Sequence, residues 1–151
     1  MNIKHAVTEK EKNELDQLLW NVLWKPLGLP RDIRQSFKLN YPQIELIAVD
    51  SGNVVGCLVA NWLSDDEIEI RHIAVSFDYQ GRSVGRRLVG KLIELVELNV
   101  PITIHTYARN TSAGFFSKLG FIPTGEYLEH PDFAKHGIAN QKMYCEIREI
   151  T

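Results

Sequence analysis

The region from Glu67 to Tyr107 limits the folds open to this chain more than any other part of its sequence. Glu67–Val75 alternates polar and apolar residues and then becomes continuously apolar, as a strand does when it enters the buried centre of a sheet. A Gly-containing loop, Gln80–Gly85, comes next, and apolar residues at helical spacing continue to about Asn99. Pro101 then opens another strand, Ile102–Tyr107, so the region predicts a strand–helix–strand unit.

The segments on either side complete a mixed fold. We expect a short strand at Met1–Val7, a helix over 9–24 that begins with the capping box Thr8-Glu9-Lys10-Glu11, a short helix at Arg31–Leu39, and a hairpin of strands 44–49 and 54–60. Further on we expect a helix at Thr111–Leu119 that ends at Gly120, and last strands at 121–124 and 142–147. This order predicts an α/β (mixed α+β) fold in a single domain over residues 1–151, with a mostly antiparallel central sheet and helices on both faces.

Composition excludes several classes of function. The chain has 151 residues with 17 Lys and Arg against 19 Asp and Glu, so no overall positive charge favours nucleic acid as a partner. No apolar run is long enough to cross a bilayer, and Met1–Lys10 lacks a signal-peptide pattern, so we expect a cytoplasmic protein. Cys57 and Cys145 lie in strand-like surroundings and are expected to be core residues rather than a disulfide or a metal site.

The loop before the long helix has the features of an anion site. Its small residues let a ligand approach the backbone, and the helix start offers unpaired amides and the positive end of a dipole. Three arginines, Arg82, Arg86 and Arg87, add positive charge, so a pyrophosphate fits. The glycines could also mark an ordinary turn, and the arginines a solvated helix face. A P-loop over Gly85–Lys91 is rejected, because Leu92 replaces the required Ser or Thr and the stretch has helical periodicity.

Three motifs follow one another in the second half of the chain. They are Ile73-Ala74-Val75, Gln80-x-x-Ser83-x-Gly85, and Asn110-x-x-Ala113-x-x-Phe116-Ser117-Lys118-Leu119-Gly120-Phe121. In this order and spacing they resemble the GNAT superfamily of acetyl-CoA-dependent N-acetyltransferases, which has Arg/Gln-x-x-Gly-x-Gly/Ala at the second motif. The resemblance implies acetyl-CoA (coenzyme A) as the cofactor. It also implies that the central strand splays from the strand Ile102–Tyr107 to admit the pantetheine arm.

The resemblance assigns the cofactor contacts residue by residue. Main-chain groups of the central strand would pair with the pantetheine arm, the loop and its amides would hold the pyrophosphate, Asn110 would contact the pantetheine or phosphate region, and Phe116 would pack near the cofactor. The strand and loop residues are Ile73, Ala74, Val75, Gln80, Gly81, Arg82, Ser83, Val84, Gly85 and Arg86.

Two positions depart from the family pattern. Ser83 replaces the first motif glycine, and it can offer its amide without strain only if its φ is not positive. Phe116 stands where many relatives have Tyr, the residue that usually protonates the departing thiolate. Since Phe has no proton to give, another group or water must supply it.

Candidate catalytic residues come from the two central strands. Glu69 is the candidate general base, on the reasoning that a partly buried carboxylate among apolar neighbours has a raised pKa. The alternative is that Glu69 shares a solvent-facing side of the strand with Glu67 and Arg71. Tyr107 could replace the missing acid, or be a packed aromatic residue. His72, on the face opposite Glu69 by strict alternation, is expected to be a structural sheet histidine.

These residues predict an acyltransferase that moves an acetyl group from acetyl-CoA to a primary amine of a small molecule or peptide by direct attack. A catalytically degenerate acyl-CoA-binding module is the alternative, because Phe116 lacks the acid. We expect neither nucleic acid nor membrane as partner, and a homodimer is possible. No metal is expected: His130 and His136 share a polar loop, but their spacing matches no zinc pattern.

Overall fold

A seven-stranded sheet organises the computed structural model, which describes residues 1–97 and 100–148. The strands are β1 (Asn2–His5), β2 (Gln43–Asp50), β3 (Asn53–Ser64), β4 (Glu67–Val75), β5 (Ile102–Arg109), β6 (Ile122–Leu128) and β7 (Asn140–Ile147). They lie in the order β1-β2-β3-β4-β5-β7-β6, and every neighbouring pair is antiparallel except β4 and β5. The predicted mixed, mostly antiparallel sheet is therefore confirmed.

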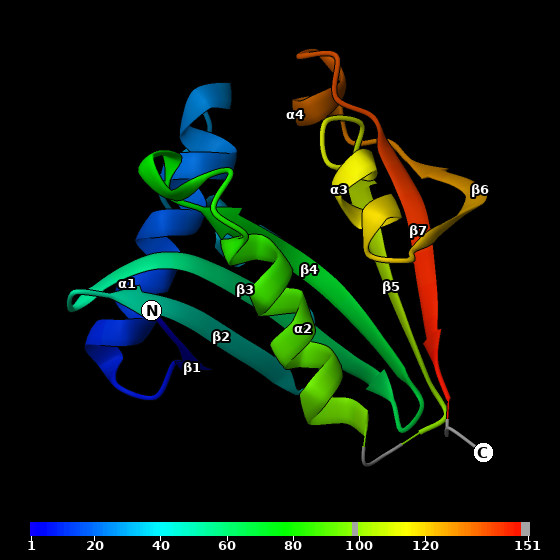
Figure 1. Ribbon diagram of the computed structural model, residues 1–151. Helices are drawn as coiled ribbons and strands as arrows, with labels where there is room; N and C mark the ends of the chain where they lie inside the picture. Colours follow the sequence, from blue (N-terminus) through cyan, green and yellow to red (C-terminus); the bar gives the residue numbers. More distant parts are fainter. Residues whose placement is uncertain (98–99, 149–151) are drawn as a thin grey trace.

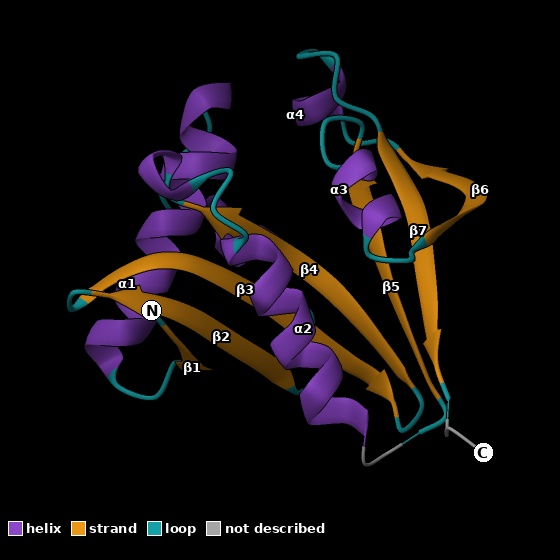
Figure 2. Cartoon of the chain, viewed as in Figure 1, coloured by secondary structure: helices purple, strands orange, loops and turns teal. Residues whose placement is uncertain are grey.

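Helices cover both faces of the sheet (Figure 1). On one face lies α1 (Glu9–Leu19), and on the other α2 (Val84–Val96) and α3 (Ala113–Lys118), while α4 (Pro131–Ala134) stands above the start of β7 (Figure 2). Each face has its own core. Leu88 and Leu92 of α2 are fully buried against the β2–β5 sheet, and Leu15 and Leu19 of α1 are fully buried against its other side. No helix within the described residues is long and apolar enough to cross a membrane.

The first helix begins as its sequence indicates but changes form earlier than expected. Thr8 and Glu11 form the predicted capping box, with Glu11 N donating to Thr8 Oγ1 over 3.1 Å and Thr8 N donating to Glu11 Oε1 over 3.0 Å. The α-helix ends at Leu19 and continues as a π-helical turn, η1 (Trp20–Trp24), and a 3-10 turn, η2 (Lys25–Leu27). This wider turn brings the end of the segment over β4.

The remaining elements match the prediction with small shifts in their bounds. The expected helix at 31–39 is a 3-10 helix, η3 (Ile33–Phe37), and a further 3-10 turn, η4 (Phe77–Tyr79), follows β4. The expected end of the long helix at Asn99 lies outside the described residues. Both cysteines are free thiols: Cys57 is fully buried in the core beneath α1, and Cys145 is half-buried on β7.

Candidate active site between the splayed strands

The two central strands separate partway along the sheet. β4 and β5 pair in parallel only from Glu67–Thr103 to Ile70–Thr106, where the Thr106 hydroxyl donates to the Ile70 carbonyl over 3.0 Å. Beyond this point β4 stays with β3 and β5 stays with β7, so the sheet opens into two arms (Figure 1). The implied splay is present, and the open edge of β4 carries the motif 73–75.

A β-bulge sits in β4 at the opening of the splay. Its partner β3 pairs consecutive residues with Ile70 and His72, which makes Arg71 an extra residue. As a result Ile70 and Ile73 both pack toward the core beneath α2, while Glu69 and His72 both face the α1 side. The prediction that His72 lies opposite Glu69 is wrong, because it assumed unbroken alternation.

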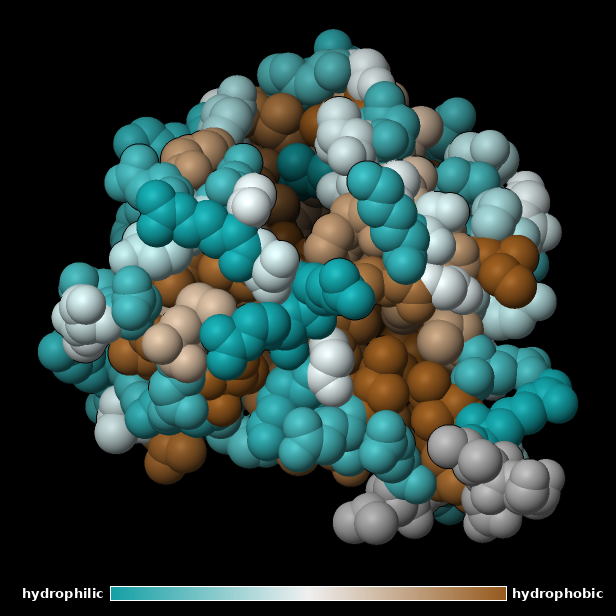
Figure 3. All heavy atoms as spheres, in the orientation of Figure 1, coloured by the Kyte–Doolittle hydropathy of each residue, from teal (hydrophilic) through white to brown (hydrophobic). Residues whose placement is uncertain are grey.

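A cavity of about 250 Å³ occupies the opening of the splay, with lining residues from both faces of the sheet. Figure 3 shows the hollow between the two arms, with apolar side chains deep inside it. Its apolar and aromatic walls come from η1, η3, α3 and the segment around α4, and its charged and polar groups come mainly from β4 and β5. The wall residues include Leu23, Trp24, Phe37, Phe116, Leu128 and Phe133, and the polar ones Glu69, Arg71, His72, Tyr107, Arg109 and His130.

Glu69 is buried, and both of its carboxylate oxygens contact neighbouring side chains. Arg71 NH1 donates to Oε2 over 2.9 Å, and His105 Nε2 lies 3.3 Å from Oε1. Burial acts to raise the pKa of Glu69, but the bond to His105 and the charge of Arg71 outweigh it and hold the pKa below its ordinary value. Both the expected raised pKa and the solvent-facing alternative are therefore wrong. On the far side of His105, Glu67 Oε1 lies 3.1 Å from Nδ1, outside hydrogen-bond geometry.

His72 packs as a neutral ring in the cavity wall. Its ring lies edge-on to Trp24, with the centroids 5.0 Å apart. Burial lowers the pKa of His72 to about 3, and the positive charges of Arg71, Arg34 and Arg109 add to this effect. The side chain therefore stays uncharged near neutral pH, in accord with its expected structural role.

The alternation of β5 brings two more side chains to the same face. Tyr107 is half-buried in the cavity wall, its ring 5.9 Å from the His105 ring at 87°. Arg109 donates from NH2 to the Leu23 carbonyl over 3.0 Å, and burial lowers its pKa. Neither His105 nor Arg109 was singled out from the sequence. Period two along β5 is the signal that places both on the face of Tyr107.

The predicted anion loop is open to solvent. Within the described chain, no acceptor lies in hydrogen-bonding geometry to the amides of 81–86. Gly81 and Ser83 both have positive φ, 78° and 64°. Ser83 was expected to be free of strain only if its φ was not positive, and this condition is not met. Ser83 adopts the left-handed region that glycine prefers, at a cost of about 1–2 kcal/mol. The absence of a side chain at Gly85 lets the Phe115 ring pack close to the backbone, since a Cβ at this position would lie 3.1 Å from that ring.

Of the other expected cofactor residues, all but Asn110 lie at the open edge of β4 or in the cavity wall. Ile73, Ala74 and Val75 form the open end of β4, where Gln80 Nε2 donates to the Val75 carbonyl over 3.1 Å. Phe116 is 2% exposed and contributes to the cavity wall. Asn110 lies apart from these residues: it is exposed, its amide side chain donates to the Gly137 carbonyl over 3.4 Å, and it does not line the cavity.

No group of three or more His, Cys, Asp or Glu side chains that could hold a metal ion occurs in residues 1–97 and 100–148. The cavity brings together carboxylate, imidazole, phenol and guanidinium groups, next to a loop of free amides.

Comparison with known proteins identifies the fold. Solved structures superpose over nearly the whole chain. One is an aminoglycoside 6'-N-acetyltransferase complexed with coenzyme A, with 19% identity, a TM-score of 0.78, and coverage of 100% of this chain and 99% of that one. Another is the ribosomal-protein-S18-alanine N-acetyltransferase from Escherichia coli, with 19% identity, a TM-score of 0.72, and coverage of 99% and 96%. An acyl-CoA N-acyltransferase from Pseudomonas aeruginosa has 20% identity, a TM-score of 0.76, and coverage of 98% and 97%.

The sequence itself matches the model of the acetyltransferase (GNAT) family over residues 11–121. This range includes the three motifs and both strands of the splay. This match covers most of the chain, and it agrees with the sheet order and the parallel β4–β5 pair. The chain therefore belongs to the acetyltransferase (GNAT) family, and it is an acetyltransferase enzyme.

Proposed function

We propose that this enzyme transfers the acetyl group of acetyl-CoA to a primary amine of a small molecule or peptide by direct attack. The observation that carries the proposal is the run of amides 81–86 without acceptors at the start of α2, beside the open edge of β4. Such a run binds a pyrophosphate through N–H groups and the helix dipole, and Arg82 and Arg86 add charge. An extended arm that pairs with Ile73–Val75 would lead from this loop toward the cavity.

In the proposed reaction, the amine nitrogen forms a bond to the thioester carbon, and the carbon–sulfur bond breaks. Main-chain amides of the open β4 edge stabilise the negative charge on the carbonyl oxygen. The amine proton passes to Glu69, directly or through a water molecule. Because its pKa is held low, Glu69 is a weak base that must pass the proton on, and His105 lies between it and the half-exposed Glu67.

The departing thiolate needs a proton that Phe116 cannot supply. Tyr107 is the proposed donor, because its phenol is in the wall of the same cavity and on the face of Glu69 and His105. Tyr107→Phe should lower kcat by roughly 100-fold or more, the usual contribution of a positioned acid. Asn110 keeps its proposed cofactor contact only if its side chain leaves Gly137 when CoA binds.

One observation favours a second function, a CoA-binding module without turnover: Phe116 has no hydroxyl group. A thiol-release assay with acetyl-CoA and an amine library separates the two functions. Release that depends on the amine supports the enzyme, and CoA binding without release over the whole library supports the module.

The cofactor site itself is tested by NMR titration of the protein with CoA. Amide resonances of residues 80–87 should shift strongly, while those of Asp65 and Asp66, in the turn at the opposite end of β4, should not. Unchanged resonances in the loop would remove the basis of the proposal. Thermal denaturation gives a second readout, since CoA at 100 times its Kd should stabilise the protein by roughly 2.7 kcal/mol.

A further inference from the structure

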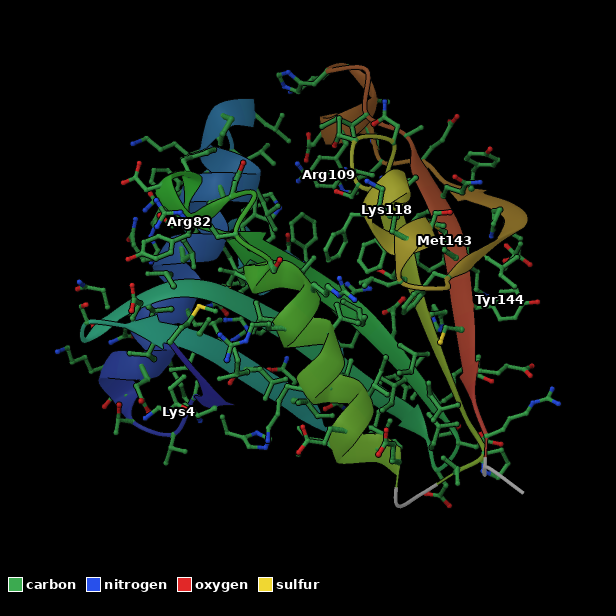
Figure 4. The ribbon with its side chains drawn as sticks, viewed as in Figure 1. Lys4, Arg82, Arg109, Lys118, Met143 and Tyr144 are labelled. Atoms are coloured by element: carbon green, nitrogen blue, oxygen red, sulfur yellow. The ribbon has the colours of Figure 1, made fainter. Side chains whose placement is uncertain are left out.

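The geometry points to an acceptor that carries a carboxylate and an apolar body beside its amine, such as a hydrophobic amino acid, with the carboxylate bound by Arg109. This inference rests on the proposed acetyl transfer and names the substrate class of the same cavity. Figure 4 shows Arg109 at the end of β5, on the arm of the splay opposite Arg82 and the anion loop. The two arginines therefore belong to different parts of the site.

Arg109 is the one arginine of the cavity wall whose charge is not matched. Its NH2 donates to the Leu23 carbonyl over 3.0 Å, and its Cζ lies 5.3 Å from the centre of the Phe133 ring. Across residues 1–97 and 100–148, no carboxylate lies within ion-pair distance of it. A guanidinium has five N–H groups in a planar fork, so most of its donors remain available to a ligand.

The other charges of the cavity wall compensate one another. Glu69 is paired with Arg71 over 2.9 Å and contacts His105, so it adds no net negative charge to the cavity. His72 is neutral. Arg34, close by, is also satisfied, by Glu45 over 2.8 Å and by Asp16 over 3.3 Å. The charge left over at the cavity is thus the single positive charge of Arg109, which a polycationic acceptor would meet unfavourably and a carboxylate would neutralise.

The apolar part of the wall determines which chemical group the acceptor carries beside its carboxylate and amine. Trp24, Phe37 and Phe133 surround the space next to Arg109, with ring centroids 5.5 Å apart for Trp24 and Phe37 and 6.0 Å apart for Phe37 and Phe133. Aromatic walls favour an apolar or aromatic group. A cavity of about 250 Å³ accommodates a body of amino-acid size. In the proposed arrangement, the acceptor's carboxylate binds Arg109, its side chain lies among the three aromatic rings, and its amine points toward the splay.

The test compares acids with their primary amides as acceptors. Thiol release from acetyl-CoA is measured with phenylalanine, leucine and methionine and with phenylalaninamide, leucinamide and methioninamide, for the wild type, Arg109→Met and Arg109→Lys. The amides differ in amine basicity, so the quantity compared is the ratio of kcat/KM for acid over amide, in which this difference cancels between proteins. Lys135→Met is the matched control, because Lys135 is an exposed cation at the end of α4.

The ratio should fall roughly 10- to 100-fold in Arg109→Met, as expected for loss of charge-assisted hydrogen bonds. It should recover partly in Arg109→Lys and stay at the wild-type value in Lys135→Met. The fall should come from KM for the acid. An unchanged ratio in Arg109→Met, or wild-type enzyme that acetylates amides but no acid, overturns the inference and leaves acetyl transfer intact. Failure of CoA to shift the loop resonances, by contrast, overturns the proposed function itself.

Discussion

The neutral state of His72 gives a quantitative prediction about acid stability. In the unfolded chain an imidazole has its ordinary pKa of 6.5, whereas in the folded protein the pKa of His72 is about 3. Between these values the unfolded state binds a proton that the folded state does not, so stability falls as the pH falls from 6.5 toward 3. At pH 5 this linkage removes about 2 kcal/mol, and the figure hardly depends on the folded pKa as long as it stays below about 4. A domain with a total stability of about 5–15 kcal/mol would show such a loss clearly.

Urea unfolding of the wild type and of His72→Phe, each at about pH 7 and about pH 5, measures this linkage. The phenyl ring keeps the contact with Trp24 but cannot take up a proton. The loss of stability between the two pH values should therefore be about 2 kcal/mol smaller in the variant than in the wild type. His136→Phe, at an exposed loop histidine, is the control for removing an imidazole as such. Equal pH dependence in the wild type and His72→Phe would refute the assignment of a neutral ring in the cavity wall.

Three further predictions concern stability. Gly56→Ala should destabilise the protein by about 1–3 kcal/mol, because its Cβ would lie 2.6 Å from a side chain of α2, whereas Gly90→Ala, with open space around it, should stabilise by about 0.5–1 kcal/mol; urea midpoints decide both. Ser83→Gly should raise stability by up to about 1 kcal/mol by relieving a positive φ, and a loss measured in the same assay would contradict the strain. Glu69→Gln should cost about 1–3 kcal/mol at neutral pH by leaving the half-buried Arg71 without its charged partner. Because the folded pKa of Glu69 is lowered, that cost should shrink as the pH falls below 4.5, and a constant gap down to low pH would count against it.

Local patterns in the sequence were sufficient for most of the fold. The capping residues Thr8 and Glu11, the alternation in 67–75 and the glycine at 120 each act through neighbouring residues, so the elements they predict appear near the expected bounds. The end of the first helix was harder to predict, because the change to a π-helical turn at Trp20 depends on packing against β4 and has no local signal.

The site was predictable only where it depends on a single strand or loop. The family motifs indicated the splay and the exposed loop, but the sequence could not show that Arg71 is an extra residue in β4. That bulge reverses the alternation beyond Ile70, so His72 was assigned to the wrong face. Likewise the pKa of Glu69 depends on His105, a neighbour in space from another strand 36 residues away, and single-strand reasoning gave the wrong direction.

The same bulge lets β4 carry one residue more than the matching stretch of β3 without changing how β3 pairs beyond it. Removing Arg71 would restore regular pairing and leave His72 and Ile73 on their present faces, whereas removing a residue between the bulge and Val75 would turn the side chains beyond it to the opposite face. Insertions in the turn 51–52 would meet no such barrier, since that turn is exposed and joins two strands at their ends. Variation in chain length is therefore tolerable at the rim of this sheet and at the bulge in β4, but not in the regularly paired stretches on either side of the bulge.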